Sequence, residues 1–401
     1  MKFIRTLTGN GSLATPVNIW RPRRKVMAPL FSLKNLNCFV SVFAKQSEIM
    51  VKRMQQEDGN GDFSFWKYIN TYTFDSICKT SLGIDLNSQL NPDQPCLEAF
   101  DVVLHILSQR LCSPWLYLDS VYKLLPCYKT FLTNRNKIYD FVDDLIKCKS
   151  KEMAARDNDS EEQTENPASE MQCLLEIMIK SSGGAKGYTD LELREEMLVI
   201  ILAGTDTSAV GAAYTALMLS RHPEVQEKVF QELQAVFQGS NRPVAVNDLP
   251  NLKYLEAVIK ETLRIYPPVP VVVREVINDV ELPSGKTLVN GVGILMNFWA
   301  MHRNPKYWGE DAEQFRPERF LEGPLKHPGQ FMPFSYSMRN CIGSTYAMMS
   351  MKTVLATLVR QYQLLPPADL APQQWADPLR VKWDIMMKHV DNYMIRIRRR
   401  K

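Results

Sequence analysis

Cys341 differs from the other cysteines of this 401-residue chain in its surroundings. It lies in the segment FSYSMRNCIG, with Arg339 two residues before it and Gly343 two residues after it. A long apolar segment, typical of a helix, follows directly. At a helix N-terminus, unpaired N–H groups and the positive end of the helix dipole favour a thiolate over a thiol. The sequence therefore predicts a cysteine that ionises readily.

Such a thiolate can act as a nucleophile or as a metal ligand. A nucleophile needs a general base, and none of the five histidines lies in a recognisable cysteine-enzyme motif. A zinc site needs several ligands, and no cysteine or histidine is near Cys341 in the sequence. Haem iron needs one axial protein ligand, and a thiolate donates electron density that favours O–O cleavage. In that interpretation Gly343 lets the backbone approach a flat macrocycle, and Arg339 meets an anionic propionate. A buried structural cysteine at a helix start is the remaining alternative.

A second polar group interrupts a long apolar segment, residues 197–219. Ala203, Gly204 and Thr207 share one helix face, where small residues let a flat cofactor lie against the helix and a hydroxyl can bond bound oxygen. The alternative for Thr207 is a hydrogen bond back to a carbonyl of the preceding turn. The segment is long enough to span a bilayer, but Asp206 in its middle favours a buried helix.

Composition limits the possible classes of protein. With 45% hydrophobic and 23% charged residues, the chain can bury a large core. A net charge of +4 is too small and too dispersed to indicate a nucleic-acid partner. The eight cysteines form no CxxC pair, which argues against a zinc site and a secreted disulfide framework and favours a reducing compartment. The basic residues 396–401 are interpreted as a solvated end, with a membrane-surface patch as the alternative.

The elements around these residues are mainly helical. Apolar positions recur at helical spacing through the first 150 residues, and residues 155–170 are predicted to be a flexible loop. Thr189 and Glu192 have the spacing of a capping box, and helices are predicted at 222–238 and 252–264. Short strands are expected at 269–276, 279–282 and 287–297. We therefore predict one domain, residues 1–401, mainly α with a small β region.

The segment from Phe334 to Ala347 resembles the haem-binding signature of the cytochrome P450 superfamily, FxxGxRxCxG with a downstream alanine. The residues that match are Phe334, Arg339, Cys341, Gly343 and Ala347. The resemblance implies that Cys341 is the proximal iron ligand and that Arg339 contacts a propionate. Ser337 departs from it, because the signature has glycine there. We expect a tight turn with positive φ, which serine adopts at a cost of about 1 kcal/mol, so haem binding should survive but loosen.

The segment AGTDTS, residues 203–208, is similar to the oxygen-activation motif of the same superfamily, (A/G)GxDT(T/S). The resemblance implies that Asp206 and Thr207 deliver protons, while Ala203 and Gly204 lie against the cofactor. Many members of family 4 carry a glutamate at the position of Ala203 that esterifies the haem. We therefore expect haem b held without that covalent bond.

Three further matches follow the order of the superfamily. Glu261 and Arg264 in KETLR, with Arg319 in FRPERF, resemble its ExxR and PERF elements, which implies a structural ion-pair network; the alternative is an ordinary surface pair. Arg274 matches a strand arginine that contacts a propionate. Trp20 and Arg24 in WRPRR resemble a WxxxR helix whose two residues also hold propionates.

FDSICKTSLGIDLNSQ, residues 74–89, is similar to family 4 in an insect-like form. The chain starts well inside the family's usual sequence, so we expect the N-terminal membrane anchor, the hinge, the first helix and the first strands to be missing. The remaining strands should then lack partners.

The resemblance implies a haem-thiolate monooxygenase of the endoplasmic reticulum membrane, on its cytosolic face. It would use O2 and electrons from NADPH, delivered by NADPH–cytochrome P450 reductase, to hydroxylate an apolar substrate such as a fatty acid, a terpenoid hormone or a xenobiotic. The full-length form would contact the membrane surface. Two alternatives stay open: a haem-thiolate isomerase or dehydratase that uses a peroxide substrate, and a truncated, catalytically inactive haem-binding fragment.

Overall fold

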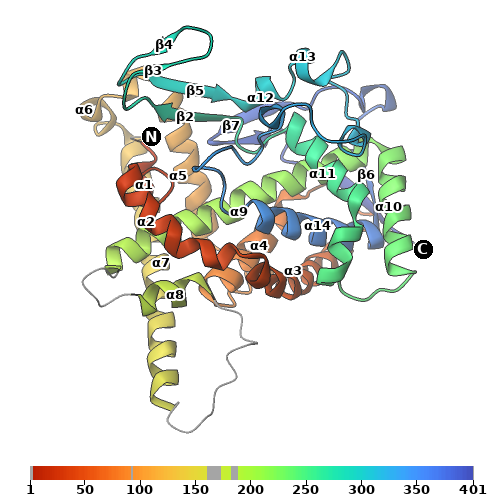
Figure 1. The fold of residues 1–401 in the computed structure, drawn as a ribbon. Helices are drawn as coiled ribbons and strands as arrows, with labels where there is room; N and C mark the ends of the chain where they lie inside the picture. Colours follow the sequence, from red (N-terminus) through yellow and green to blue (C-terminus); the bar gives the residue numbers. More distant parts are fainter. Residues whose placement is uncertain (1–2, 92–93, 160–172, 182–187, 401) are drawn as a thin grey trace.

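Helix α9 (Asp190–Arg221) runs through the middle of the molecule, and the other long helices pack around it (Figure 1). The computed structural model describes residues 3–91, 94–159, 173–181 and 188–400. The long helices around α9 are α2 (Val17–Met27), α3 (Leu33–Met54), α4 (Trp66–Ile77), α5 (Pro95–Cys112), α7 (Pro126–Asp159), α10 (Pro223–Phe237), α11 (Lys253–Ile265) and α14 (Ser344–Gln361). The short ones are α1 (Arg5–Thr8), α6 (Asp119–Tyr122), α8 (Leu174–Lys180), α12 (Phe298–Met301) and α13 (Pro305–Trp308).

The start of α9 is fixed by the predicted capping box. The backbone N–H of Glu192 donates to Thr189 Oγ1 at 3.3 Å, and the Thr189 N–H donates to Glu192 Oε2 at 3.0 Å. Within the described residues, α9 is long and apolar enough to cross a membrane by itself, and residues 17–31 with 33–57 form a bent pair that passes the same test. Because 83% of the apolar window of α9 is buried, it is packed here as a core helix.

The strands form small antiparallel sheets at the edge of the helical body. β2 (Val271–Glu275) pairs with β5 (Gly293–Asn297), β3 (Val280–Glu281) with β4 (Thr287–Leu288), and β7 (Val381–Asp384) with β8 (Met386–His389). A three-stranded sheet has the order β1 (Phe63–Ser64), β9 (Met394–Arg399), β6 (Tyr362–Leu365). The prediction of a mainly α fold with a small β region is confirmed. The strands predicted at 269–276 and 279–282 are found as β2 and β3, whereas the strand predicted at 287–297 is divided into β4 and β5, which pair with different strands.

Among the described residues, β2 and β5 pair only with each other. Val273 and Leu295 are 40% and 59% exposed on this two-stranded sheet. The predicted loop at 155–170 was placed too early, since α7 continues through Asp159; residues 160–170 lie outside the described residues.

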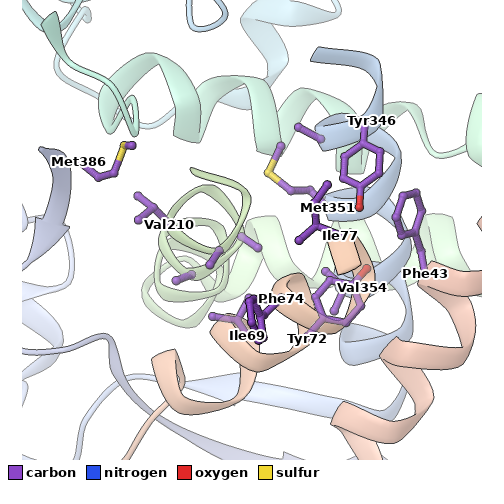
Figure 2. Close-up of a cluster of buried hydrophobic side chains, with 14 of the residues drawn as sticks. Phe43, Ile69, Tyr72, Phe74, Ile77, Val210, Tyr346, Met351, Val354 and Met386 are labelled. Atoms are coloured by element: carbon purple, nitrogen blue, oxygen red, sulfur yellow. The ribbon is translucent and has the colours of Figure 1, made fainter. Parts of the chain in front are cut away.

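Aromatic side chains join three of the helices into one core (Figure 2). The ring of Tyr346 on α14 meets Phe43 on α3 edge to face, with centroids 5.0 Å apart. Tyr72 on α4 donates a hydrogen bond to the carbonyl of Ser350 at 3.2 Å. Thus α14, which starts immediately after the Cys341 segment, packs against α3 through the ring of Phe43 and is hydrogen-bonded to α4 through the buried Tyr72 hydroxyl.

Helices α4 and α9 approach each other closely at Gly204. A Cβ atom built on Gly204 would lie 2.5 Å from Ile77 Cδ1, inside the contact distance that real Cβ atoms show. The absence of a side chain at Gly204 therefore serves the packing of α4 on α9.

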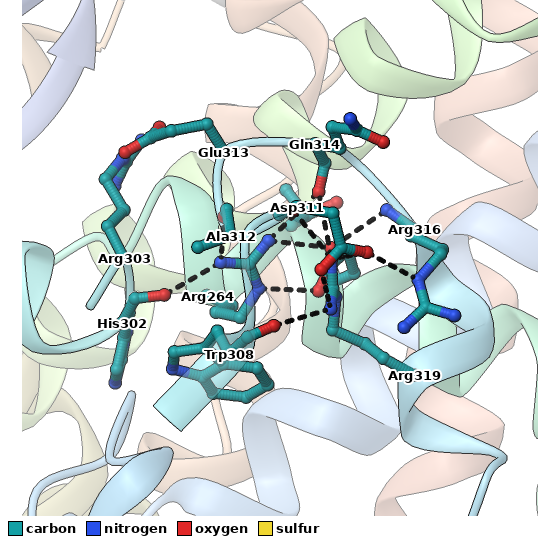
Figure 3. Close-up of polar contacts among 12 residues, drawn as sticks. Arg264, His302, Arg303, Trp308, Asp311, Ala312, Glu313, Gln314, Arg316 and Arg319 are labelled. Atoms are coloured by element: carbon teal, nitrogen blue, oxygen red, sulfur yellow. Dashed lines mark hydrogen bonds and ion pairs between the residues drawn. The ribbon is translucent and has the colours of Figure 1, made fainter. Parts of the chain in front are cut away.

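A buried carboxylate ties α11 to the segment that leads towards Cys341 (Figure 3). Glu261 accepts hydrogen bonds from Arg264 Nε at 2.7 Å, from Arg319 Nε at 3.0 Å and from the N–H of Arg316 at 2.9 Å. Arg264 also donates to the carbonyls of His302 and Ala312, at 2.7 and 2.6 Å. The structure thus brings the predicted residues Glu261, Arg264 and Arg319 together. All three are buried, so they do not form an ordinary surface pair.

Glu261→Gln is expected to lower the free energy of unfolding by about 3 to 5 kcal/mol, because two buried guanidinium groups lose the charge that compensates them. Urea unfolding of the full chain measures this loss. Glu313→Gln is the matched control: it also removes a glutamate paired with arginine, but its side chain is 69% exposed, so the change should stay below about 1 kcal/mol. Equal effects of the two substitutions would contradict this description of the network.

Candidate active site

Cys341 lies at the end of a tight loop that leads into α14. Its N–H donates to the carbonyl of Phe334 at 2.9 Å, and the N–H of Asn340 donates to the carbonyl of Ser337 at 3.0 Å. Gly343 is the N-cap residue of α14, so the cysteine precedes the helix by three residues. The loop is therefore closed by its own backbone and presents Cys341, which is exposed, beside a helix N-terminus.

Ser337 has φ 69°, which is the positive φ expected for the residue in the place of the signature glycine. Ser335 also has a positive φ, 62°. For residues with a Cβ atom this conformation is strained. The loop around Cys341 thus holds two serines in a backbone conformation that favours glycine.

The pKa of the Cys341 thiol is raised, mainly because the surrounding protein desolvates the sulfur. The N–H of Gly343 and the charge of Arg24 act in the opposite direction, as expected beside a helix N-terminus. The prediction of a thiol that ionises more readily than usual was thus wrong in its net direction. Coordination to a metal ion deprotonates a thiol outright, so the raised pKa is compatible with a ligand role.

Helix α2 places Arg24 against this loop. Arg24 Nη1 donates to the carbonyl of Asn340 at 2.9 Å, and Nη2 donates to its side-chain Oδ1 at 3.0 Å. The residue next to Cys341 is therefore held by a two-point contact, and the guanidinium charge lies close enough to lower the pKa of the thiol. Nothing in the residues around Asn340 indicated this contact from the sequence.

Trp20, one turn earlier on α2, lies under Arg339. The Arg339 guanidinium is 4.5 Å from the centroid of the Trp20 ring, and Nη2 donates to the carbonyl of Thr15 at 2.6 Å. Burial and the charge of Arg274 lower the pKa of Arg339. The two guanidinium groups are thus close enough to repel each other.

None of Arg24, Arg274 and Arg339 forms an ion pair with a carboxylate in the described parts of the chain. Repelling cations without anionic partners favour binding of a ligand that carries carboxylates of its own. This donor set fits the two propionates of haem. Haem iron needs one axial protein ligand, which the exposed Cys341 can supply.

Helix α9 is buried from Glu195 to Ser220 except at Ala203, Gly204 and Thr207, which are partly exposed. These residues were predicted to share one face, and the structure leaves all three partly exposed. Thr207 Oγ1 donates to the carbonyl of Ala203 at 2.6 Å, so the hydroxyl makes the backbone hydrogen bond that was the alternative to a ligand contact.

Asp206 is buried, in contrast to its neighbour Thr207. Its Oδ1 forms an ion pair with Lys388 Nζ at 3.2 Å, and Lys388 also contacts Asp101 at 3.0 Å. Burial raises the pKa of Asp206, while the charge of Lys388 lowers it. Sequence reasoning missed Lys388, because a lysine in a short C-terminal strand carries no local signal of a contact with α9.

Ion pairs of Arg23 join α2 directly to α9. Arg23 Nη1 donates to Glu196 Oε1 at 2.8 Å, and Nη2 donates to Glu192 at 2.9 Å. Glu196 also accepts a hydrogen bond from the hydroxyl of Ser12 at 2.9 Å. Helix α2 therefore fixes both the Cys341 loop, through Arg24, and α9, through Arg23.

Comparison with known proteins gives a consistent result. A family model described as Cytochrome P450 matches residues 2–389. Cytochrome P450 4d2 of Drosophila melanogaster is 34% identical over 381 residues, which cover 91% of this chain and 74% of that protein. Cytochrome P450 4c21 of Blattella germanica is 33% identical, over 88% of this chain and 71% of that protein. Cytochrome P450 4V2 of Homo sapiens is 31% identical, over 100% of this chain and 75% of that protein.

Ser337→Gly is expected to raise the free energy of unfolding by about 1 kcal/mol and to slow the loss of haem, because glycine adopts the positive φ without strain. Unfolding in urea and transfer of haem to an acceptor protein measure the two effects. Ser41→Gly, on the exposed face of α3, should instead destabilise, since glycine in a helix interior is unfavourable. Equal haem retention in wild type and Ser337→Gly would show that the serine is harmless.

Proposed function

Because this chain belongs to the cytochrome P450 family, we propose that it hydroxylates a small apolar substrate with O2 and electrons from NADPH. The family makes it a haem-thiolate monooxygenase. The proposal adds the electron donor, NADPH–cytochrome P450 reductase, and the substrate class, which is a fatty acid, a terpenoid hormone or a xenobiotic. Its central support is the set of arginines near the exposed Cys341 that have no carboxylate partner among the described residues.

In this proposal Cys341 is the axial ligand, while Arg24, Arg274 and Arg339 bind the propionates. Trp20 orients Arg339 through the face of its ring. Bound haem supplies the activation of O2, and the protein supplies binding, orientation and a low-dielectric site. The haem is haem b without an ester bond to the protein, since Ala203 has no carboxyl group.

Phe334 and Gly343 position the sulfur by backbone contacts. The carbonyl of Phe334 accepts the hydrogen bond of the cysteine N–H, and the N–H of Gly343 points to the thiol. Gly343 has an ordinary φ of −88°, and a Cβ atom there would lie 3.9 Å from Cys341 Sγ. Neither the backbone conformation nor a contact with the loop therefore requires glycine at position 343. We assign the benefit of glycine there to access for the cofactor.

Asp206 and Thr207 are assigned to proton delivery. Thr207 lies on the partly exposed face of α9, where a bound ligand can compete for the hydroxyl that now bonds to Ala203. The buried Asp206 holds a carboxylate one residue away, with a pKa raised by burial. An acid and a hydroxyl at these positions favour a monooxygenase over the isomerase or dehydratase alternative, which needs no proton supply from the protein.

Contact with a membrane surface is supported by a group of apolar side chains between α5 and α7. Trp115, Leu118 and Leu124 are 68%, 64% and 86% exposed. Large apolar residues gathered in one short segment favour an interface with lipid or protein over free solution. We assign this segment to the cytosolic face of the endoplasmic reticulum membrane.

The reduced, CO-bound absorption spectrum tests the proposal. Wild type should show a Soret band shifted far to the red, as expected of thiolate ligation, and should turn over with NADPH and reductase. Cys341→Ser should lose both, whereas Cys148→Ser, which removes an exposed cysteine on α7, should change neither.

Other outcomes identify the alternatives. No haem uptake, or a histidine-like Soret band, would support the inactive fragment, for which the strained Ser337 and the unpaired edges of β2 and β5 are the motivating observations. Conversion of a hydroperoxide without reductase would support the isomerase or dehydratase.

A further inference from the structure

Strand β5 lies outside β2, at the rim of the molecule (Figure 1). Among the described residues it pairs with β2 alone, so one of its two edges has no strand beside it. The unpaired edge of a strand presents N–H and C=O groups that can bind a further strand. β5 is therefore an open edge to which another strand can add.

The backbone groups at this open edge belong to alternate residues of β5. The N–H of Val276 donates to the carbonyl of Val292 at 3.0 Å, at the end of the ladder that joins β2 to β5. In an antiparallel pair each residue directs its N–H and C=O groups to the same side, and successive residues alternate. Ile294 therefore faces β2, whereas Gly293 and Leu295 direct their N–H and C=O groups to the open edge.

Apolar side chains accompany this edge on the outer face of the sheet. Val273 and Leu295 are direct cross-strand partners, and they are 40% and 59% exposed. Val289 and Val292, which come just before β5, are 55% and 46% exposed. Exposed apolar side chains beside unpaired backbone groups favour an interface over contact with water.

The segment around β5 is uncharged. Residues 287–301 contain no Asp, Glu, Lys or Arg, although 23% of the whole chain is charged. Edge strands commonly carry charges or proline, which prevent pairing with other chains, and the edge strand β7 has Lys382 and Asp384. The sequence of β5, GILMN, has neither. Two copies of this segment can therefore approach each other without repulsion between like charges.

We propose that two copies of this chain associate through the open edge of β5, with the two strands antiparallel about a two-fold axis at Leu295. In this register Leu295 lies opposite Leu295 of the second copy, and Gly293 lies opposite Asn297. The outward N–H and C=O groups of each copy bind those of the other, so that β2 and β5 of both copies form one four-stranded sheet. On its outer face the two leucines and the flanking Val273 side chains form a continuous apolar stripe.

A second copy fits this edge better than lipid does. Acyl chains offer no partner for the N–H and C=O groups of Gly293 and Leu295, and burial of such groups without partners is costly. A two-fold contact needs a surface that is complementary to itself, which an uncharged antiparallel edge provides. Because one edge strand buries less area than a standard interface, we expect a reversible dimer with a Kd on the order of 10 µM. This association goes beyond the proposed function and does not depend on it.

Sedimentation velocity of the full chain at concentrations between about 1 and 100 µM tests the dimer. Wild type should change from monomer to dimer over this range. Leu295→Lys places two like charges opposite each other and should weaken the association by about 10-fold or more. Leu295→Pro should have a similar effect, because it removes an N–H that points away from β2.

Leu295→Cys provides a second measurement. Opposite residues of a hydrogen-bonded antiparallel pair have Cα atoms about 5.5 Å apart, which a disulfide can span. Under mild oxidation Leu295→Cys should therefore form a covalent dimer that wild type does not form. Val280→Lys and Val280→Cys are the matched controls, because Val280 is 47% exposed but lies on β3, outside the edge strand. Neither should change the association or form a covalent dimer.

A chain that stays monomeric at all these concentrations would overturn the proposal, as would equal effects of Leu295→Lys and Val280→Lys. Flotation with phosphatidylcholine–phosphatidylserine vesicles tests the other occupant. If Leu295→Lys abolishes vesicle binding and leaves sedimentation unchanged, the edge contacts lipid and the dimer is wrong. Circular dichroism checks that each variant folds; if Leu295→Pro does not, Leu295→Lys and Leu295→Cys still decide.

Discussion

The buried carboxylate of Glu261 organises the half of the molecule that carries Cys341. It has no exposure to solvent, and it accepts hydrogen bonds from the side chains of Arg264 and Arg319 and from a backbone N–H. Arg264 in turn donates hydrogen bonds to carbonyls of the 302–314 segment and so fixes its position. Since a buried charge is tolerated only when fully compensated, the segment before the Cys341 loop has few alternative positions.

Helix α2 fixes the segments on the other side of the site. Successive arginines point to different partners: Arg23 to Glu196 on α9, and Arg24 to Asn340 beside the cysteine. Because the two contacts share one short helix, a displacement of α2 would disturb both the Cys341 loop and the position of α9. Among the described residues, Arg24, Arg274 and Arg339 have no carboxylate partner and are only partly buried, so their charges are available to an anionic ligand.

The sequence predicted those structural features that depend on neighbouring residues. The capping box of Thr189, the strands between 269 and 297 and the positive φ at Ser337 depend on neighbouring residues, and each is found in the structure. The contacts of Asn340 and Lys388 depend on residues more than 100 positions away, so no window of the chain indicates them. The acidity of Cys341 was misjudged for a similar reason. The N–H effect is local, but desolvation comes from the whole fold.

Helix α9 has to serve two different environments along the same turn. Ala203 and Thr207 are partly exposed, while Asp206 is buried and its charge is paired with Lys388. An apolar neighbour at position 388 would leave that charge uncompensated, and a fully exposed Asp206 would lose the burial that raises its pKa. The bridging lysine resolves this conflict, because it keeps the carboxylate buried and yet connected to solvent through Asp101.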